Sequence, residues 1–164
     1  MRRLPLVLLF FALLLAIDPL ETQAGQVEPG LMEMEVLGVS ADPRSGQPRL
    51  LLRTKDHGRH LTLFIGPFEA TGILLPLQRM TPPRPYTHDL VVNLLTELQA
   101  TLVRVVITEL KDDTFFALVI LAVGGREIHL DARPSDAIAL ALRTKSPIFA
   151  AEAAFPRSPT VKAQ

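Results

Sequence analysis

Period-two patterning in the first third of the chain predicts three strands. Residues 34–39 alternate, and an extended pattern resumes over residues 49–55, after the turn residues at 42–46. These two segments predict a hairpin. A third run, over residues 60–65, places its apolar side chains on one face. We therefore expect the folded domain to open with three strands.

The spacing of apolar positions then changes to three and four residues, which is typical of helices. A short helix is predicted from Pro67, because a first-turn proline does not need the N–H that it lacks. The prolines of residues 81–85 predict a rigid connector. A second helix is predicted over residues 88–99, with Thr87 as its N-cap and Asp89 in its first turn. Its apolar side chains form one predicted stripe: Leu90, Val91, Leu94, Leu95 and Leu98.

The second half of the chain predicts a three-stranded meander and a third helix. Residues 103–108 alternate, residues 115–123 are almost wholly apolar, and residues 126–130 follow a Gly-Gly turn. We expect the middle strand of these three to be covered on both faces. Pro134 begins a helix of nearly uninterrupted apolar residues, and residues 147–150 predict a last short strand.

The order of the predicted elements, βββ-αα-βββ-α-β, determines the expected fold class. It lacks the strict alternation of strands and helices that a doubly wound fold requires. We therefore expect an α+β domain with a mixed, largely antiparallel sheet and about three helices.

The first residues have the features of a secretory signal. Residues 1–24 begin with two arginines, continue through the apolar run of residues 4–17 and end in small residues. As a helix this run would measure about 21 Å, which is too short for a hydrocarbon layer of roughly 30 Å. We expect cleavage and a secreted or periplasmic protein with no stable membrane span; without cleavage, the segment would anchor the chain to a membrane. Residues 25–32 are expected to be a linker, residues 33–155 the folded domain and residues 156–164 a disordered tail.

Composition limits the chemistry that the chain can carry. Its 164 residues include 17 basic and 17 acidic side chains, so the formal net charge is zero and any site for a polyanion has to be local. The chain has no cysteine, which excludes disulfides, thiolate zinc sites and cysteine nucleophiles. It also has no tryptophan, and aromatic residues make up only 5% of the chain.

Polar residues concentrate at the starts of the second and third predicted helices, over residues 87–89 and 131–136. The exposed amides of a helix N-terminus favour anions, and Arg133 is the best candidate for binding a phosphate beside them. A structural interpretation remains open, because the same residue types cap helices and Arg133 could pair with Asp131 or Asp89.

His88 is the best candidate for moving a proton, since it is the imidazole among these polar residues. It does not pair with Asp89 by spacing alone, because adjacent helical residues point about 100° apart. The other histidines lack zinc-site spacing. Ser135 lacks the G-x-S-x-G elbow of a serine hydrolase, so a serine nucleophile is a minor alternative.

Four segments, in the same order along the chain, resemble the bifunctional nuclease (BFN) domain family. The resemblance spans roughly residues 33–155 and is carried by Ile65-Gly66-Pro67-Phe68-Glu69-Ala70, Arg84-Pro85-Tyr86-Thr87-His88-Asp89-Leu90, Thr114-Phe115-Phe116-Ala117 and Asp131-Ala132-Arg133-Pro134-Ser135-Asp136-Ala137-Ile138-Ala139-Leu140-Ala141. It implies an α+β domain that assembles as a homodimer, binds nucleic acid and acts as a nuclease on DNA and RNA. No organic cofactor is expected.

The polar positions within these motifs are the candidate site residues that the resemblance implies. The catalytic candidates are His88, Asp89, Asp131 and Asp136, the substrate-binding candidates are Arg133 and Ser135, and the candidate ligands for Mg²⁺ or Mn²⁺ are Asp131, Asp136 and Glu69. In this hypothesis Arg133 binds the scissile phosphate and His88 moves a proton. The alternative is a non-catalytic binding or dimeric assembly module on the same fold.

Overall fold

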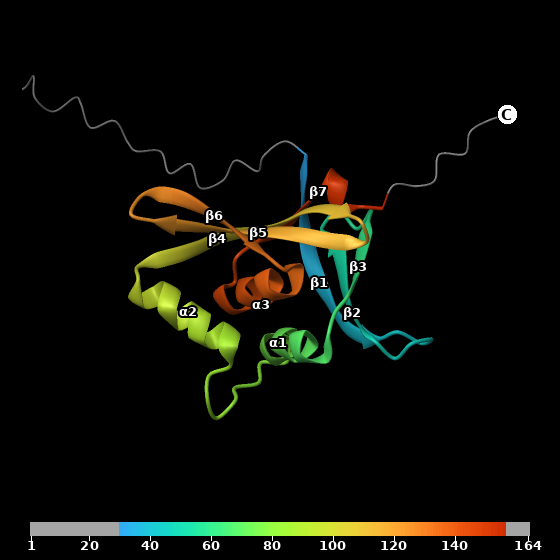
Figure 1. The fold of residues 1–164 in the computed structure, drawn as a ribbon, viewed down its shortest axis with the longest axis horizontal. Coiled ribbons are helices and arrows are strands. Elements are labelled where there is room, and N and C mark those ends of the chain that lie inside the picture. The colour runs from blue at the N-terminus through green and yellow to red at the C-terminus, as the bar shows by residue number, and fades with distance from the viewer. Residues whose placement is uncertain (1–29, 157–164) are drawn as a thin grey trace, which may run out of the picture.

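The computed structural model describes residues 30–156 (Figure 1). The expected signal segment, most of the expected linker and nearly all of the expected tail lie outside this range. The described elements are β1 (Leu31–Ala41), β2 (Pro48–Thr54), β3 (His60–Phe64), α1 (Pro67–Leu77), α2 (Thr87–Glu97), β4 (Ala100–Lys111), β5 (Thr114–Val123), β6 (Arg126–Ala132), α3 (Pro134–Thr144), β7 (Ile148–Ala151) and the short 3₁₀ helix η1 (Glu152–Ala154). This order confirms the predicted one.

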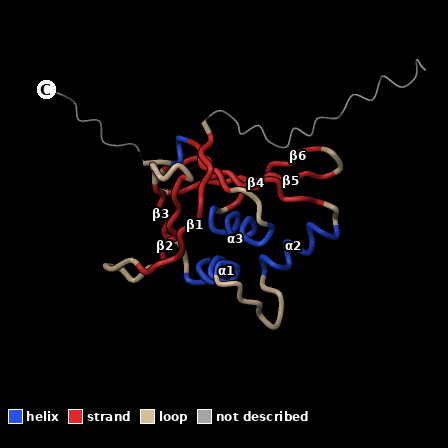
Figure 2. The backbone as a smooth tube through the Cα atoms, turned by 180° about the vertical axis from the view of Figure 1, so that it is seen from behind, coloured by secondary structure: helices blue, strands red, loops and turns tan. Residues whose placement is uncertain are grey.

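The seven strands form a single mixed sheet in the order β3-β2-β1-β7-β4-β5-β6. All neighbouring strands are antiparallel except β4 and β7, which are parallel. The three helices lie together on one side of the strands, and the β1–β3 part of the sheet runs in a different direction from the β4–β6 part (Figures 1 and 2). The expected α+β class is confirmed. Among the described residues, no helix is long and apolar enough to cross a membrane.

The first strand begins earlier than its pattern predicts. Leu31 and Met32, which fall within the expected linker, already belong to β1 and pair with Ala151 and Ala150 of β7. A strand boundary of this kind depends on a partner more than a hundred residues away, so local periodicity does not reveal it.

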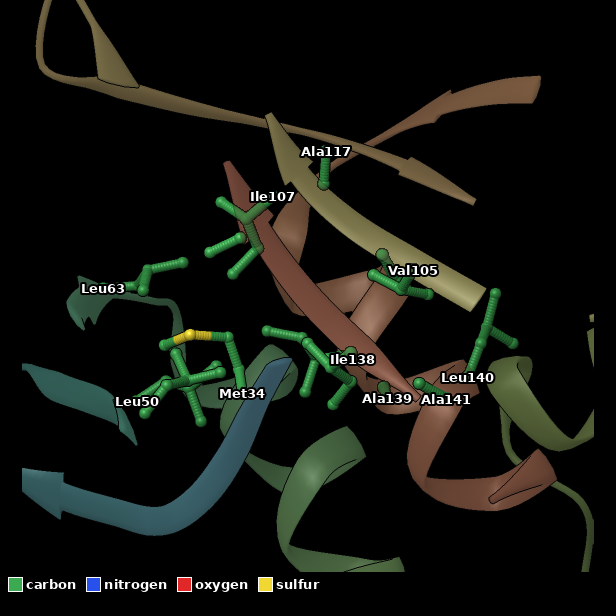
Figure 3. Close-up of a cluster of buried hydrophobic side chains, with 14 of the residues drawn as sticks. Met34, Leu50, Leu63, Val105, Ile107, Ala117, Ile138, Ala139, Leu140 and Ala141 are labelled. Atoms are coloured by element: carbon green, nitrogen blue, oxygen red, sulfur yellow. The ribbon is translucent and has the colours of Figure 1, made fainter. Parts of the chain in front are cut away.

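The main core lies between the helices and the sheet (Figure 3). Helix α3 is its centre, because Ile138 and the alanines around it are fully buried against Val105 and Ile107 of β4. Small alanine side chains let this helix pack closely on the strands. The packing fixes the direction of α3 and therefore the position of its first turn.

Two expectations about packing hold only in part. Strand β5 packs against the helices on one face only, while its other face contributes Ile120 to a small cluster with Val106 and Phe149, and Phe116 stays exposed. The predicted stripe of α2 is buried along one edge only. Its Val91 and Leu95 pack on the core, whereas the leucines at positions 90, 94 and 98 are exposed. The apolar stripe of α2 is wider than the surface that the core covers, so its outer leucines stay exposed.

Candidate active site

The first turns of the three helices bring polar side chains together. Glu69 lies in the first turn of α1, His88 in that of α2 and Asp136 in that of α3, where Arg133 is the N-cap residue. Proline at the first position of α3, Pro134, fixes the backbone there. The two polar helix starts that the sequence singles out therefore belong to one cluster, formed by Glu69, His88, Arg133 and Asp136.

Arg133 is held between two carboxylates. Its Nη1 donates to Glu69 Oε1 at 2.8 Å, its Nε donates to Asp136 Oδ2 at 2.7 Å and its Nη2 donates to Asp136 Oδ1 at 3.3 Å. Hydrogen bonds and charge from Asp136, followed by those from Glu69, raise the pKa of Arg133 above its ordinary value. The side chain is still 65% exposed, so the outer edge of the guanidinium faces water. Neither Asp131 nor Asp89, the structural partners considered from sequence, pairs with it.

His88 is paired with Asp136 from the neighbouring helix. Its Nε2 lies 3.1 Å from Asp136 Oδ1. Burial would raise the pKa of Asp136, but hydrogen bonds from Arg133 and His88 outweigh burial and hold the pKa below its ordinary value. An ionised carboxylate accepts hydrogen bonds only, so Nε2 is the nitrogen that carries the proton in this contact. The only ring nitrogen that can have a free lone pair is then Nδ1.

Two glycines of the α1 region give these side chains their space. A Cβ at Gly72 would lie 2.8 Å from His88 Cε1 and 2.9 Å from its Nδ1, and a Cβ at Gly66 would lie 2.3 Å from Glu69 Oε2. All three distances are shorter than those that real Cβ atoms show. Sequence reasoning missed both residues. A signal was present in Gly72, because glycine weakens a helix interior and its presence there indicates a packing requirement.

Asp89 lies next to His88 in sequence but is used elsewhere. Its Oδ2 accepts from the Tyr86 amide at 2.8 Å, as in a capping box, and its Oδ1 accepts from Arg143 Nε at 2.5 Å. Burial would raise the pKa of Asp89, yet the hydrogen bonds from Arg143 and Tyr86 lower it overall. The structure thus places Asp89 in a contact between helices, one residue away from the imidazole.

Asp131 and Ser135 are not members of the ion pairs of the cluster. Asp131 pairs with Leu118 across β5 and β6, and Leu118 packs in the small cluster on the sheet face away from the helices. Directly opposed residues of a sheet share a face, so Asp131 points away from Glu69 and Asp136. Ser135 is 7% exposed in the first turn of α3.

The expected Mg²⁺ or Mn²⁺ site does not fit this arrangement. Within residues 30–156, no group of three or more histidine, aspartate or glutamate side chains is placed to hold a metal ion. The guanidinium of Arg133 occupies the position between Glu69 and Asp136 that a cation would take.

Comparison with known proteins gives a consistent family assignment. The model of the family described as "Bifunctional nuclease domain" matches residues 50–161. An uncharacterized protein of Mycobacterium tuberculosis (strain ATCC 25618 / H37Rv) is 42% identical over 121 residues, which cover 74% of this chain and 72% of the mycobacterial protein. "Bifunctional nuclease 1" of rice (Oryza sativa subsp. japonica) is 36% identical over 119 residues, with 62% of this chain and 35% of the rice protein covered.

Proposed function

The chain belongs to the bifunctional nuclease domain family, and from this premise we propose that it is a nuclease that hydrolyses phosphodiester bonds in DNA and RNA. The observation that carries the proposal is the contact between His88 and Asp136, 3.1 Å long, beside an exposed guanidinium. A phosphodiester hydrolase needs a group that binds the phosphate and a group that moves a proton, and this cluster offers both.

In this proposal Arg133 binds the scissile phosphate. A guanidinium has five N–H groups, and three of them are used by Glu69 and Asp136. One N–H on Nη1 and one on Nη2 remain for phosphate oxygens, on a side chain that is 65% exposed. The two carboxylates hold the guanidinium in one orientation before the substrate arrives, so less conformational entropy is lost on binding.

His88 moves the proton in the proposed reaction. Asp136 keeps Nε2 protonated, so Nδ1 is the nitrogen that accepts a proton from the attacking water. The Nδ1 edge lies against Gly72, where any larger residue would bring a Cβ within 2.9 Å. Glycine at this position therefore leaves room for the ring, and the proposal requires that water reach Nδ1 through the part of the side chain that is 16% exposed.

The proposal includes export and assembly into a homodimer. Export is supported by the two arginines, the apolar run and the small residues of residues 1–24. Dimerisation is supported by β6, which is an edge strand of the sheet with Ile128 and Leu130 exposed. N-terminal sequencing of the exported protein tests the first, and sedimentation tests the second.

A second function, a binding or assembly module without catalysis, is favoured by the charge of the cluster. One guanidinium faces two carboxylates, which leaves no excess positive charge when His88 is neutral. Phosphate backbones are attracted mainly by uncompensated positive charge. If this function is correct, Arg133 is an internal ion-pair partner that joins α1 to α3.

Digestion of supercoiled plasmid and total RNA by the purified protein separates the two functions. The nuclease proposal predicts cleavage of both substrates, lost in Arg133→Ala and retained in the control Arg126→Ala at the exposed start of β6. The module predicts intact substrates across pH. Parallel reactions with Mg²⁺, Mn²⁺ and EDTA test separately whether cleavage requires a metal ion. A fluorophosphonate probe tests whether Ser135 is a nucleophile, and we expect no labelling.

A further inference from the structure

We infer that Arg143, in the last turn of α3, is a positioning residue that holds the His88 imidazole in place. The inference rests on the proposed role of His88 in proton transfer. It assigns a function to a residue that lies outside the cluster of Glu69, His88, Arg133 and Asp136. It also explains what Asp89 contributes.

The Arg143 guanidinium joins all three helices. Its Nε donates to Asp89 Oδ1 of α2 at 2.5 Å, and its Nη1 donates to the Gly72 carbonyl of α1 at 2.7 Å and to the Ala139 carbonyl of α3 at 2.9 Å. The side chain is only 8% exposed. Charged hydrogen bonds that are shielded from water are strong, and removing one partner leaves the others unsatisfied.

Two of these contacts fix the surroundings of His88. Gly72, whose carbonyl Arg143 binds, is the residue against which the Nδ1 edge of the imidazole lies. Asp89, whose carboxylate Arg143 binds, directly follows His88 on α2. The same guanidinium therefore sets both the backbone that carries the ring and the surface that the ring packs on.

Both ends of helix α3 thus help to determine the position of the imidazole. Asp136 in the first turn binds Nε2, while Arg143 in the last turn holds Gly72 and Asp89. These two α3 residues are seven positions apart, which is about 10 Å along a helix. A rotation or shift of α2 against α3 would break the bond to Asp136, and the Arg143 contacts oppose that motion.

The test compares Arg143→Lys with the matched control Arg53→Lys. Lysine keeps the charge but cannot bridge two acceptors with the fixed geometry of guanidinium. Arg53 also binds a carboxylate through Nε, that of Glu35 at 2.8 Å, but it lies on β2 away from the helices. Circular dichroism and thermal unfolding establish that each variant is folded.

The primary measurement is the ring ¹⁵N spectrum of His88 at one fixed pH. We expect Arg143→Lys to shift or broaden the His88 ring signals and to weaken the signal of the hydrogen bond from Nε2 to Asp136. Arg53→Lys should leave both unchanged. His88 ring signals unchanged in a folded Arg143→Lys protein would overturn the inference. This measurement does not need catalysis, so it decides the positioning role even if the wild-type protein cleaves no nucleic acid.

Kinetics provide the second readout. A displaced proton-transfer group lowers kcat, and we expect a loss of about ten- to a hundred-fold in Arg143→Lys. KM should change by less than about three-fold, because Arg133 keeps its carboxylate partners. A rise in KM of ten- to a hundred-fold with an unchanged kcat would contradict the inference. If Arg143→Lys does not fold, Asp89→Asn, which keeps the shape and removes the charge, is measured in the same two ways with the same expected and contradicting results.

Discussion

Atom Nε2 of His88 lies 3.1 Å from Oδ1 of Asp136, and this contact joins the first turn of α2 to the first turn of α3. The two residues are separated by 48 positions in the chain. Arg133 binds the same carboxylate from the other side, so one aspartate orients both the imidazole and the guanidinium. A change at Asp136 should therefore affect both proton transfer by His88 and phosphate binding by Arg133.

The first prediction concerns Asp136→Asn. An amide in place of the carboxylate no longer enforces the Nε2-protonated form of His88, so we expect kcat to fall by about a hundred-fold or more. The control is Glu127→Gln, which alters an exposed histidine–carboxylate contact of 3.4 Å to His129 on β6. Single-turnover cleavage of a labelled oligonucleotide measures the effect. Equal rates for wild type and Asp136→Asn would exclude the pair from the chemistry.

The second prediction concerns Gly72→Ala. The added Cβ would lie 2.8 Å from His88 Cε1, so the ring or helix α1 has to shift. We expect a destabilisation of about 1–3 kcal/mol together with loss of cleavage. Gly58→Ala is the matched control, because its Cβ would make an ordinary 3.4 Å contact with Asp56. Urea unfolding and plasmid cleavage are measured for both. The interpretation fails if Gly72→Ala is as stable and as active as Gly58→Ala.

Local patterns predicted the elements of this fold because the side chains that a helix or strand buries recur with that element's own period. The alternation in residues 60–65 and the proline at position 67 mark the change from strand to helix, and the structure agrees. Strand β7 shows the limit. Its insertion between β1 and β4 depends on pairing with Met34 and Val105, which lie far from it in the chain. No local pattern contains that information.

The same limit applies to the site. His88, Arg133 and Asp136 stand at helix starts, where polar residues are conspicuous, and sequence reasoning selected them. Arg143 stands in the last turn of a helix, where a basic residue is ordinarily explained by the helix dipole. Its contacts with Asp89 and Gly72 come entirely from the packing of three helices. Asp131 is a candidate because it is a polar position in the motif that begins at residue 131, but the strand register places it on the opposite face of the sheet.

The third prediction tests the core that positions α3. Ile138 is fully buried at the centre of this helix, so Ile138→Ala should cost about 2–5 kcal/mol of the free energy of unfolding. Leu94→Ala on the outward face of α2 is the control and should cost less than about 1 kcal/mol in the monomer. Denaturant unfolding at several protein concentrations measures both. A large, concentration-dependent loss in Leu94→Ala would mean that a second copy covers this face of α2.

The last prediction concerns Asp89 and the fall in the free energy of unfolding at acid pH. Its pKa in the folded protein is held below the ordinary value of 3.8, because the hydrogen bonds from Arg143 and Tyr86 outweigh burial. The unfolded state therefore binds more protons in acid than the folded state does. The stabilisation by this carboxylate is complete well above pH 3.8 and is lost as the pH falls through the folded pKa.

At neutral pH we expect Asp89→Asn to lower the free energy of unfolding by about 2 kcal/mol. The difference between wild type and variant should begin to shrink about one unit above the ordinary carboxyl pKa and should continue to shrink below it. Other carboxylates with lowered pKa values, such as Asp42 and Asp136, are present in both proteins and cancel in the difference. Asp113→Asn, in the exposed turn between β4 and β5, serves as the control. Urea unfolding at successive pH values gives the curve, and a difference that stays constant from neutral to acid pH would show that the Arg143 contact does not depend on the charge of Asp89.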